Sequence, residues 1–271
     1  MLRAADVHFG YRPGTPILRG VSVNVQPGAL MGILGPNGSG KSTLLRILAG
    51  ILRPSRGSVT LDEVNLDRIA RKTVARRIAM VPQETHLAFD YTVLEVALMG
   101  RYPHLAAFEI EGPADFDLAR NALRATGTLS LADRSFATLS GGEKQRVIIA
   151  AALAQIATPG SVTHPLLLLD EPTTALDVGY VLETAELLRR LQRDHPLAIV
   201  VCTHDLNFAA GLCDSLVLLK DGEIGAAGAT DAVLTPENIR AVYGVDAEVR
   251  HHDSAGHLVV VPVARAATPL P

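Results

Sequence analysis

The chain has 271 residues, of which 48% are hydrophobic, and a formal net charge of −3 at pH 7. This length and composition allow one or two domains with a full hydrophobic core. The acidic balance argues against a general nucleic-acid-binding protein, because such proteins usually carry a clustered basic excess that neutralises phosphates.

The cysteines and the apolar runs indicate the compartment. Cys202 and Cys213 fit no disulfide framework and no metal-ligand spacing, which is typical of a reducing cytosol. No apolar run reaches the roughly 18 residues of a membrane span. The N-terminal segment MLRAADVHFGY carries charges where a signal peptide is apolar. We therefore expect a protein that is soluble on its own.

The first elements read as antiparallel strands, and the pattern then changes. Residues 2–9 and 21–25 are strand-like and are separated by turns rich in proline and glycine. From Leu30 onward, the continuous apolar segments at residues 30–34, 166–169 and 198–202 are typical of strands buried on both faces of a parallel sheet. The sequence therefore predicts an α/β core preceded by an antiparallel β subdomain.

The stretch between these core strands is helical in character. Thr92 and Glu95 form a capping-box pattern that opens one helix, and residues 115–127 form a second amphipathic run. We expect a helical subdomain at about residues 86–138 inserted in a domain of residues 1–244. Asp221-Gly222 then predicts a hairpin turn. The segment at residues 235–243 and a short β-like tail at residues 245–271 end the chain.

Residues 35–42, GPNGSGKS, fit the phosphate-binding pattern GxxxxGK[ST] between a predicted strand and a predicted helix. Glycines allow the backbone N–H groups to approach a triphosphate, and the positive end of the following helix faces the same anion. We expect Lys41 to reach the outer phosphates and Ser42 to offer its hydroxyl to Mg²⁺. The predicted nucleotide-binding residues of this segment are Gly35, Pro36, Asn37, Gly38, Ser39, Gly40, Lys41, Ser42 and Thr43.

Four leucines at residues 166–169 precede Asp170 and Glu171, which places both carboxylates at the carboxyl end of a buried strand. Adjacent side chains on a strand point to opposite sides. We expect Asp170 to join the Mg²⁺ shell and Glu171 to polarise the water that attacks the γ-phosphate.

The segment Leu139 to Glu143, LSGGE, precedes a long helical run. Ser140 and Glu143 form a capping-box pattern that opens any helix. Gly141 and Gly142 weaken a first turn but let its N–H groups approach an anion, so a phosphate contact explains them better.

With these elements in order, residues 2–243 resemble the ATP-binding subunits of ABC transporters. The motifs that carry the resemblance are Tyr11, GPNGSGKST, Gln83 in VPQ, LSGGE, LLLLDEP, Ala175-Leu176-Asp177 and His204 in THD. The resemblance implies that Tyr11 stacks on adenine, that Gln83 senses Mg²⁺ and the membrane partner, that His204 contacts the γ-phosphate, and that Asp177 belongs to the nucleotide site.

The same resemblance implies an assembly. ATP lies at the interface of a head-to-tail homodimer, and Ser140, Gly141, Gly142 and Glu143 of one subunit close over the nucleotide of the other. Two membrane-spanning permease subunits and a substrate-binding protein are the implied partners, with the ATPase at the cytoplasmic face of the membrane. The segment from Leu87 to Leu105, Glu143 and THDLNFAAGLCD resemble the ATPases that import iron chelates, haem and cobalamin.

Several alternatives remain open at this stage. A soluble ATPase of iron-sulfur cluster assembly shares the loop and the signature. A DNA-repair ATPase would need a long coiled coil, and a translation factor would need two ATPase units.

Other residues depart from the family pattern or form clusters of their own. Ala151 stands where the family often has arginine. The cluster His251, His252, Asp253 and His257 indicates a solvated tail rather than a metal site. The basic residues Arg68, Arg71, Lys72, Arg76 and Arg77 predict a solvated helix face without nucleic-acid binding.

Overall fold

A computed structural model describes residues 1–85, 87–158, 164–174 and 177–266. The chain divides into two compact units, Met1–Asn65 with Val200–Pro271, and Leu66–Ile199. The domain boundaries expected from the sequence remain predictions. Ala175, Leu176 and residues 159–163 lie outside the described residues.

The first unit opens with an antiparallel sheet, as the sequence predicts. Its strand order is β2 (Leu18–Val25), β1 (Leu2–Phe9), β4 (Arg56–Leu61) and β5 (Val64–Asn65). Leu2, Ala4 and Val7 of β1 are buried. The register shifts around Asp6, which has a positive φ of 50°, so the alternation of buried residues breaks there.

The same unit carries the strand that leads into the phosphate-binding loop. β3 (Leu30–Leu34) is buried along its whole length and pairs in parallel with β9 (Ser215–Lys220). β9 continues through the predicted turn at Asp221-Gly222 into the antiparallel β10 (Glu223–Ala229). β8 (Ala198–Thr203), whose residues 200–203 belong to this unit, lies next to β3. The helices of this unit are α1 (Lys41–Leu48), α7 (Leu206–Leu212), α8 (Thr230–Val233) and α9 (Pro236–Tyr243).

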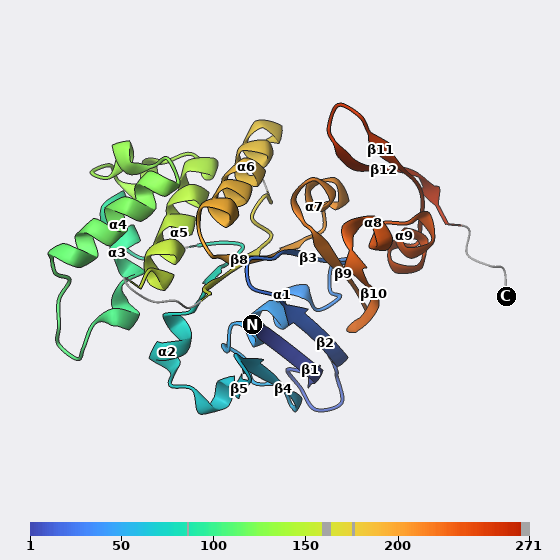
Figure 1. Ribbon diagram of the computed structural model, residues 1–271, viewed down its shortest axis with the longest axis horizontal. Helices are drawn as coiled ribbons and strands as arrows, with labels where there is room; N and C mark the ends of the chain where they lie inside the picture. Colours follow the sequence, from blue (N-terminus) through green and yellow to red (C-terminus); the bar gives the residue numbers. More distant parts are fainter. Residues whose placement is uncertain (86, 159–163, 175–176, 267–271) are drawn as a thin grey trace. The chain divides into compact units, whose positions relative to one another are not determined.

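The C-terminal tail forms a β-hairpin of β11 (Val245–His252) and β12 (His257–Arg265). The hairpin packs on α7 through β12 and on α9 through β11 (Figure 1). The β character expected from the sequence is therefore present, and the tail is attached to two helices of the unit.

The second unit holds the parallel pair β6 (Ile78–Val81) and β7 (Leu166–Asp170) together with the helical part of the chain. Its helices include α2 (Arg71–Ala75), α3 (Val93–Met99), α4 (Pro113–Ala125), α5 (Gly141–Ile156) and α6 (Val178–Asp194). Short 3₁₀ turns occur at η1 (Leu66–Arg68), η2 (Tyr102–His104), η3 (Leu129–Leu131) and η4 (Phe136–Thr138).

Helices α3, α4 and α5 lie side by side around their own apolar core (Figure 1). Val93, Leu123 and Val147, one from each helix, are fully buried there. The predicted capping box of Thr92 and Glu95 opens α3: Glu95 N donates to Thr92 Oγ1 at 3.3 Å, and Thr92 N donates to Glu95 Oε2 at 2.7 Å. The end of α3 approaches α5 closely, because a Cβ on Gly100 would lie 2.1 Å from the carbonyl oxygen of Ala151.

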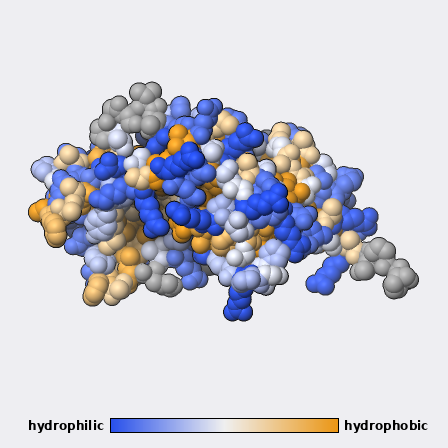
Figure 2. All heavy atoms as spheres, turned by 90° about the horizontal axis from the view of Figure 1, so that it is seen from below, coloured by the Kyte–Doolittle hydropathy of each residue, from blue (hydrophilic) through white to orange (hydrophobic). Residues whose placement is uncertain are grey.

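Among the described residues, no helix is both long and apolar enough to span a bilayer. On the face drawn in Figure 2, hydrophobic residues occur among hydrophilic ones. Exposed apolar side chains are ordinary on a globular surface.

Candidate nucleotide-binding site

The phosphate-binding loop, residues 35–42, connects β3 to α1 in the first unit. The backbone turns back on itself, since Ser39 N donates to Pro36 O at 3.2 Å, and Gly222 N donates to Ser39 O at 3.2 Å. Strand, loop and helix therefore occur in the predicted order. The start of α1 carries no side-chain cap, which leaves its first N–H groups without a capping side chain.

Two glycines of this loop are required by the fold itself. Gly40 has a φ of 104°, and a Cβ there would lie 2.7 Å from Leu18 Cδ2. A Cβ on Gly35 would lie 2.1 Å from the carbonyl oxygen of Leu219 in β9. The glycines of the loop are expected from the sequence to let a phosphate approach; Gly35 and Gly40 also serve packing within the unit.

Lys41 is buried, with 5% of its surface exposed, and its ammonium lies inside the turn of the loop. Its Nζ donates to Gly35 O at 2.9 Å and to Pro36 O at 3.2 Å. Burial of an ammonium is costly unless it is hydrogen-bonded, so these carbonyls hold the charge at the start of α1. The carbonyl oxygen of Lys41 in turn accepts a long bond of 3.7 Å from the Cys202 thiol in β8.

Two hydroxyl groups near the loop are buried. Ser39 is 3% exposed, and its Oγ has no hydrogen-bond partner within the described residues; the Tyr243 Oη is buried as well. Burial raises the pKa of the Tyr243 hydroxyl well above its ordinary value, and the backbone of Gly35 acts weakly in the opposite direction. Tyr243 therefore stays neutral beside the start of the loop.

Tyr11 and His204 complete the predicted residues of the first unit. Tyr11 is 55% exposed, and its ring meets that of Phe9 edge to face with centroids 5.0 Å apart. An exposed aromatic face of this kind can stack on a base. His204 is exposed and stands between the end of β8 and the start of α7.

In the second unit, Asp170 and Glu171 lie at the carboxyl end of β7, as expected. Asp170 is the last residue of the strand and is 3% exposed. Glu171 follows with a φ of 47°, a conformation that residues with a Cβ rarely adopt. The Thr174 hydroxyl donates to Glu171 Oε2 at 2.9 Å, and Thr174 N donates to Glu171 O at 3.2 Å. This turn fixes the direction in which the carboxylate leaves the strand.

Gln83 is exposed on the segment that follows β6. β6 is the parallel neighbour of β7, with Val81 opposite Leu169. The carboxyl ends of two adjacent parallel strands lie at the same edge of the sheet. Gln83 therefore lies in the segment that leaves the same edge of this strand pair at which Asp170 and Glu171 lie.

The signature segment forms the predicted capping box at the start of α5. Glu143 N donates to Ser140 Oγ at 3.3 Å, and Ser140 N donates to Glu143 Oε2 at 2.8 Å. The backbone and the hydroxyl of Ser140 hold the pKa of the Glu143 carboxyl below its ordinary value. Ser140 and Gly141 are exposed, so the first turn of the helix faces solvent in this unit.

Gly142 has a packing role that the sequence did not indicate. It is buried, and a Cβ there would lie 2.3 Å from Tyr180 Cδ1. Tyr180 belongs to the first turn of α6, where its N–H donates to Asp177 Oδ1 at 3.1 Å. The structure thus brings the signature turn next to the helix that Asp177 caps. The available sequence signal for this contact was an aromatic residue, Tyr180, three positions after the capping Asp177.

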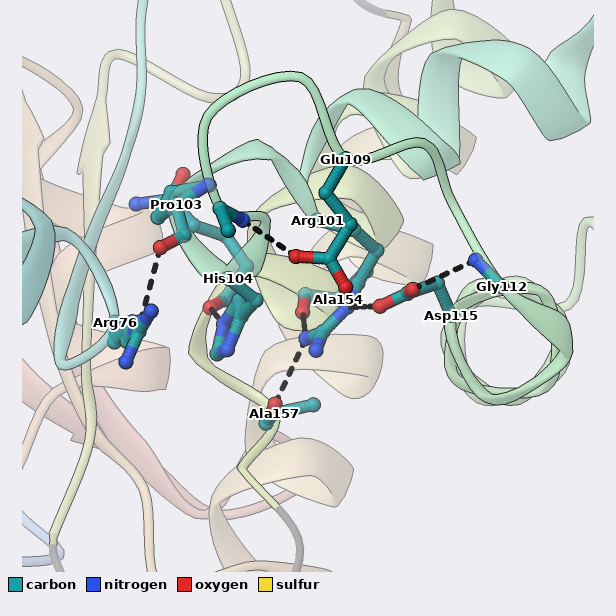
Figure 3. Close-up of polar contacts among 11 residues, drawn as sticks. Arg76, Arg101, Pro103, His104, Glu109, Gly112, Asp115, Ala154 and Ala157 are labelled. Carbon is teal, nitrogen blue, oxygen red and sulfur yellow. Dashed lines mark hydrogen bonds and ion pairs between the residues drawn. The ribbon is translucent and has the colours of Figure 1, made fainter.

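The sequence also did not indicate a group of polar contacts around Arg101 at the C-terminal end of α5. Arg101 is 4% exposed, and its Nε lies 2.9 Å from Asp115 Oδ1 (Figure 3). Its Nη1 donates to the carbonyl oxygens of Ala154 at 2.6 Å and Ala157 at 2.8 Å (Figure 3). A guanidinium with its donors satisfied by carbonyls at a helix C-terminus also opposes the negative end of the helix dipole.

On the basic face of α2 and its flanks, Arg68, Arg71 and Lys72 are exposed, as the sequence predicts, while Arg76 and Arg77 are partly buried. Lys72 Nζ donates to Leu105 O at 2.6 Å, and Arg76 Nε donates to Pro103 O at 2.9 Å (Figure 3). These two cations therefore bind η2 and the residue that follows it. Within the described ranges, no group of three His, Cys, Asp or Glu side chains is placed to hold an ion.

The comparisons with known proteins agree with this arrangement. The sequence profile described as ABC transporter matches residues 18–174. The hemin import ATP-binding protein HmuV of Gloeobacter violaceus is 44% identical over 270 residues, covering 98% of this chain and 95% of that protein. The cobalamin import ATP-binding protein BtuD of Halobacterium salinarum is 41% identical over 250 residues. The matched region covers 92% of this chain but only 61% of that relative's length.

Solved structures give the same result. A metal-chelate type ABC transporter in an inward-facing conformation superposes with a TM-score of 0.82 at 30% identity, covering 97% of this chain and 96% of that one. A dimeric structure of a bacterial ABC transporter cassette superposes with a TM-score of 0.72 at 30% identity, covering 85% of this chain and 99% of that one. The chain therefore belongs to the ABC transporter family and carries its nucleotide-binding ATPase fold.

Proposed function

We propose that the chain is the ATP-binding and hydrolysing subunit of an ABC importer, coupling ATP hydrolysis to uptake of an iron chelate, haem or cobalamin. One observation carries the proposal: a phosphate-binding loop with a buried Lys41 lies between β3 and α1 in a chain whose relatives are named hemin and cobalamin import ATP-binding proteins. A buried cation at a helix start is suited to binding a triphosphate.

In this proposal the first unit binds the nucleotide. Lys41 exchanges its bonds with Gly35 O and Pro36 O for bonds with the outer phosphate oxygens. The exposed Tyr11 stacks on adenine, and His204 contacts the γ-phosphate. The remaining phosphate contacts come from the backbone N–H groups of Gly38, Ser39, Gly40, Ser42 and Thr43, beside Asn37 and Pro36.

The donors for Mg²⁺ are of the types this ion prefers. The Ser42 hydroxyl, the Gln83 amide oxygen and the buried Asp170 carboxylate are hard oxygen ligands. The ion neutralises charge on the phosphates when it is bound. Glu171 accepts the proton of the attacking water, and the bond from the Thr174 hydroxyl limits the directions its carboxylate adopts.

The partners are a second copy of the chain, two membrane-spanning permease subunits and a substrate-binding protein. The dimeric cassette structure supports the second copy. In the closed dimer, Ser140, Gly141, Gly142 and Glu143 of one subunit cover the ATP of the other, with Asp177 beside them. The chain is then located at the cytoplasmic face of the membrane through its permease subunits.

A pair of variants tests the chemistry. Glu171→Gln keeps the geometry of the carboxyl group but cannot accept a proton, so ATP binding should persist while turnover falls by about 100-fold or more. Lys41→Ala removes a phosphate partner and should weaken ATP binding itself. Equilibrium binding of labelled ATP and release of phosphate measure the two effects, and normal hydrolysis by Glu171→Gln would refute the assignment of the base.

The membrane partner is tested by affinity purification. Glu171→Gln with ATP holds the closed dimer while the chain is purified from detergent-solubilised membranes. We expect a polytopic membrane protein to co-elute, and its binding-protein partner can then be titrated with haem, ferric chelates and cobalamin. Recovery of soluble partners alone would favour the ATPase of iron-sulfur cluster assembly instead.

A further inference from the structure

The C-terminal hairpin, β11 with β12, is the part of the first unit that the proposed chemistry does not use. Its base is joined to α9: Arg240 Nε lies 2.8 Å from Asp246 Oδ1, and Ala266 N donates to Gly244 O at 2.9 Å. An isolated two-stranded hairpin is marginally stable in water. The hairpin therefore depends on what it packs against.

Its second attachment is to α7, through one side chain. Asn207 Nδ2 donates to Val260 O at 3.1 Å, and Asn207 Oδ1 accepts from Val260 N at 2.8 Å. One amide thus satisfies both backbone groups of a β12 residue, as a neighbouring strand would. Val260 is 2% exposed. One turn of α7 after Asn207, the ring of His257 lies against Gly211, and a Cβ on Gly211 would lie 3.0 Å from His257 Nε2.

The helix that Asn207 anchors begins two residues after His204. Asp205 N donates to Thr203 Oγ1 at 3.1 Å, and Asp205 Oδ1 accepts from Asn207 N and Phe208 N at 2.9 Å each. Thr203 is 2% exposed and ends β8. His204 therefore stands between a residue fixed by the sheet and the cap of α7.

The position of α7 comes from tertiary contacts. A helix of seven residues is too short to be stable by itself. Phe208 and Leu212 bury its apolar side, and α7 packs on both β3 and β12. The Asn207 bonds are the polar part of the second contact and lie in the first turn, next to the cap.

We propose that Asn207 is a positioning residue for the ATPase reaction: by joining the first turn of α7 to Val260 of the hairpin, it holds His204 in place for its contact with the terminal phosphate. The inference rests on the proposed role of His204. It gives the C-terminal hairpin a function in turnover and requires no ligand of its own.

A double-mutant cycle on the full chain tests this inference. Asn207→Ala should lower kcat for ATP hydrolysis about tenfold and change KM for ATP by less than about twofold, because the contact is made to the phosphate that is transferred. In a His204→Ala background, Asn207→Ala should lower kcat no further.

Asn238→Ala is the matched control, since Asn238 Nδ2 donates to Val233 O at 2.9 Å in the same unit. It should lower the urea midpoint as Asn207→Ala does while leaving kcat unchanged. Should His204→Ala leave too little turnover to quantify, this comparison of kcat at matched stability decides the question. Multiplicative losses in the cycle, or equal kcat losses in the two asparagine variants, overturn the inference alone. Unchanged kcat in His204→Ala overturns the proposed role of His204, and the inference with it.

Discussion

The backbone at Glu171 adopts a conformation that residues with a side chain rarely adopt. Its φ of 47° lies directly after the fully buried β7, and Thr174 bonds both to its carboxylate and to its carbonyl oxygen. A left-handed conformation costs about 1–2 kcal/mol for a non-glycine residue. Strain of this kind persists where the surrounding structure fixes it, and it often accompanies a functional side chain.

Gly142 gives a prediction at the same scale. Alanine is the better helix former by about 1 kcal/mol, but a Cβ at 2.3 Å from Tyr180 Cδ1 cannot be accommodated without movement of the ring. We expect Gly142→Ala to lower the free energy of unfolding by about 1–3 kcal/mol, as overpacking does. Urea denaturation measures the change. Gly112→Ala is the control, because nothing lies within 4 Å of a Cβ there, and equal effects of the two substitutions would contradict the packing argument.

At the scale of elements, α5 is fixed at both ends by side chains. Ser140 and Glu143 cap its first turn, and Arg101 binds the carbonyl oxygens of Ala154 and Ala157 at its last turn (Figure 3). Gln155 extends the second contact, since its Nε2 donates to Ala75 O at 2.8 Å and Ile78 O at 3.1 Å. The helix that carries the signature is therefore joined to α2 and β6 within the second unit.

Removal of Arg101 should be costly. Arg101→Met leaves the Asp115 carboxylate, which is only 17% exposed, without its cation, and we expect a loss of about 3–5 kcal/mol in the free energy of unfolding. Asp115→Asn in the same chain should recover part of that loss, since the unpaired charge is gone while Gly112 N keeps an acceptor. Arg240→Met breaks an exposed pair and should cost about 0–1 kcal/mol. Comparable losses for the two arginines would contradict the role of burial.

The junction between η2 and α5 should also make stability depend on pH. Burial lowers the pKa of His104 below its ordinary value, and the positive charges of Arg101 and Arg76 lower it further. The carbonyl oxygen of Gln155, 2.7 Å from His104 Nε2, and the Asp115 carboxylate raise the pKa but do not cancel this effect. The stabilisation is full above the unfolded-state pKa of about 6.5 and is lost as the pH falls through the lower folded-state value.

His104→Gln tests this dependence, because its amide can still donate to Gln155 O but does not titrate. Urea unfolding between about pH 8 and about pH 5 should show a smaller loss of stability on acidification for the variant than for the unchanged chain. Parallel curves would exclude His104 as the titrating group.

At the scale of the whole molecule, the two cysteines offer a probe of unfolding in a chain without tryptophan. Cys202 is 0% exposed and Cys213 is 4% exposed, and both belong to the first unit with the phosphate-binding loop. We expect no thiol to react with an aromatic disulfide reagent in the folded chain and both to react in denaturant. Bound ATP at about 100 times its Kd should slow the reaction by up to about 100-fold, since opening then requires release of the nucleotide. Fast labelling without denaturant would contradict this burial.

The sequence by itself determined the local elements and the family. Continuous apolar runs marked β3, β7 and β8, because strands buried on both faces need no polar alternation. Both capping boxes and the Asp221-Gly222 turn were predicted correctly, since each depends on residues a few positions apart. The roles of individual site residues remain predictions from motif order.

Only the tertiary structure decided the contacts between residues distant in the sequence. The packing of Gly142 on Tyr180, the bonds of Arg101 with the end of α5 and the attachment of Val260 to Asn207 join residues separated by 38 to 56 positions of chain. The basic face of α2 was predicted to be solvated; Arg76 and Arg77 are partly buried, and Arg76 binds the carbonyl of Pro103 in η2. A local pattern reports the period of an element and its ends, whereas the partner of a side chain depends on which elements the fold brings together.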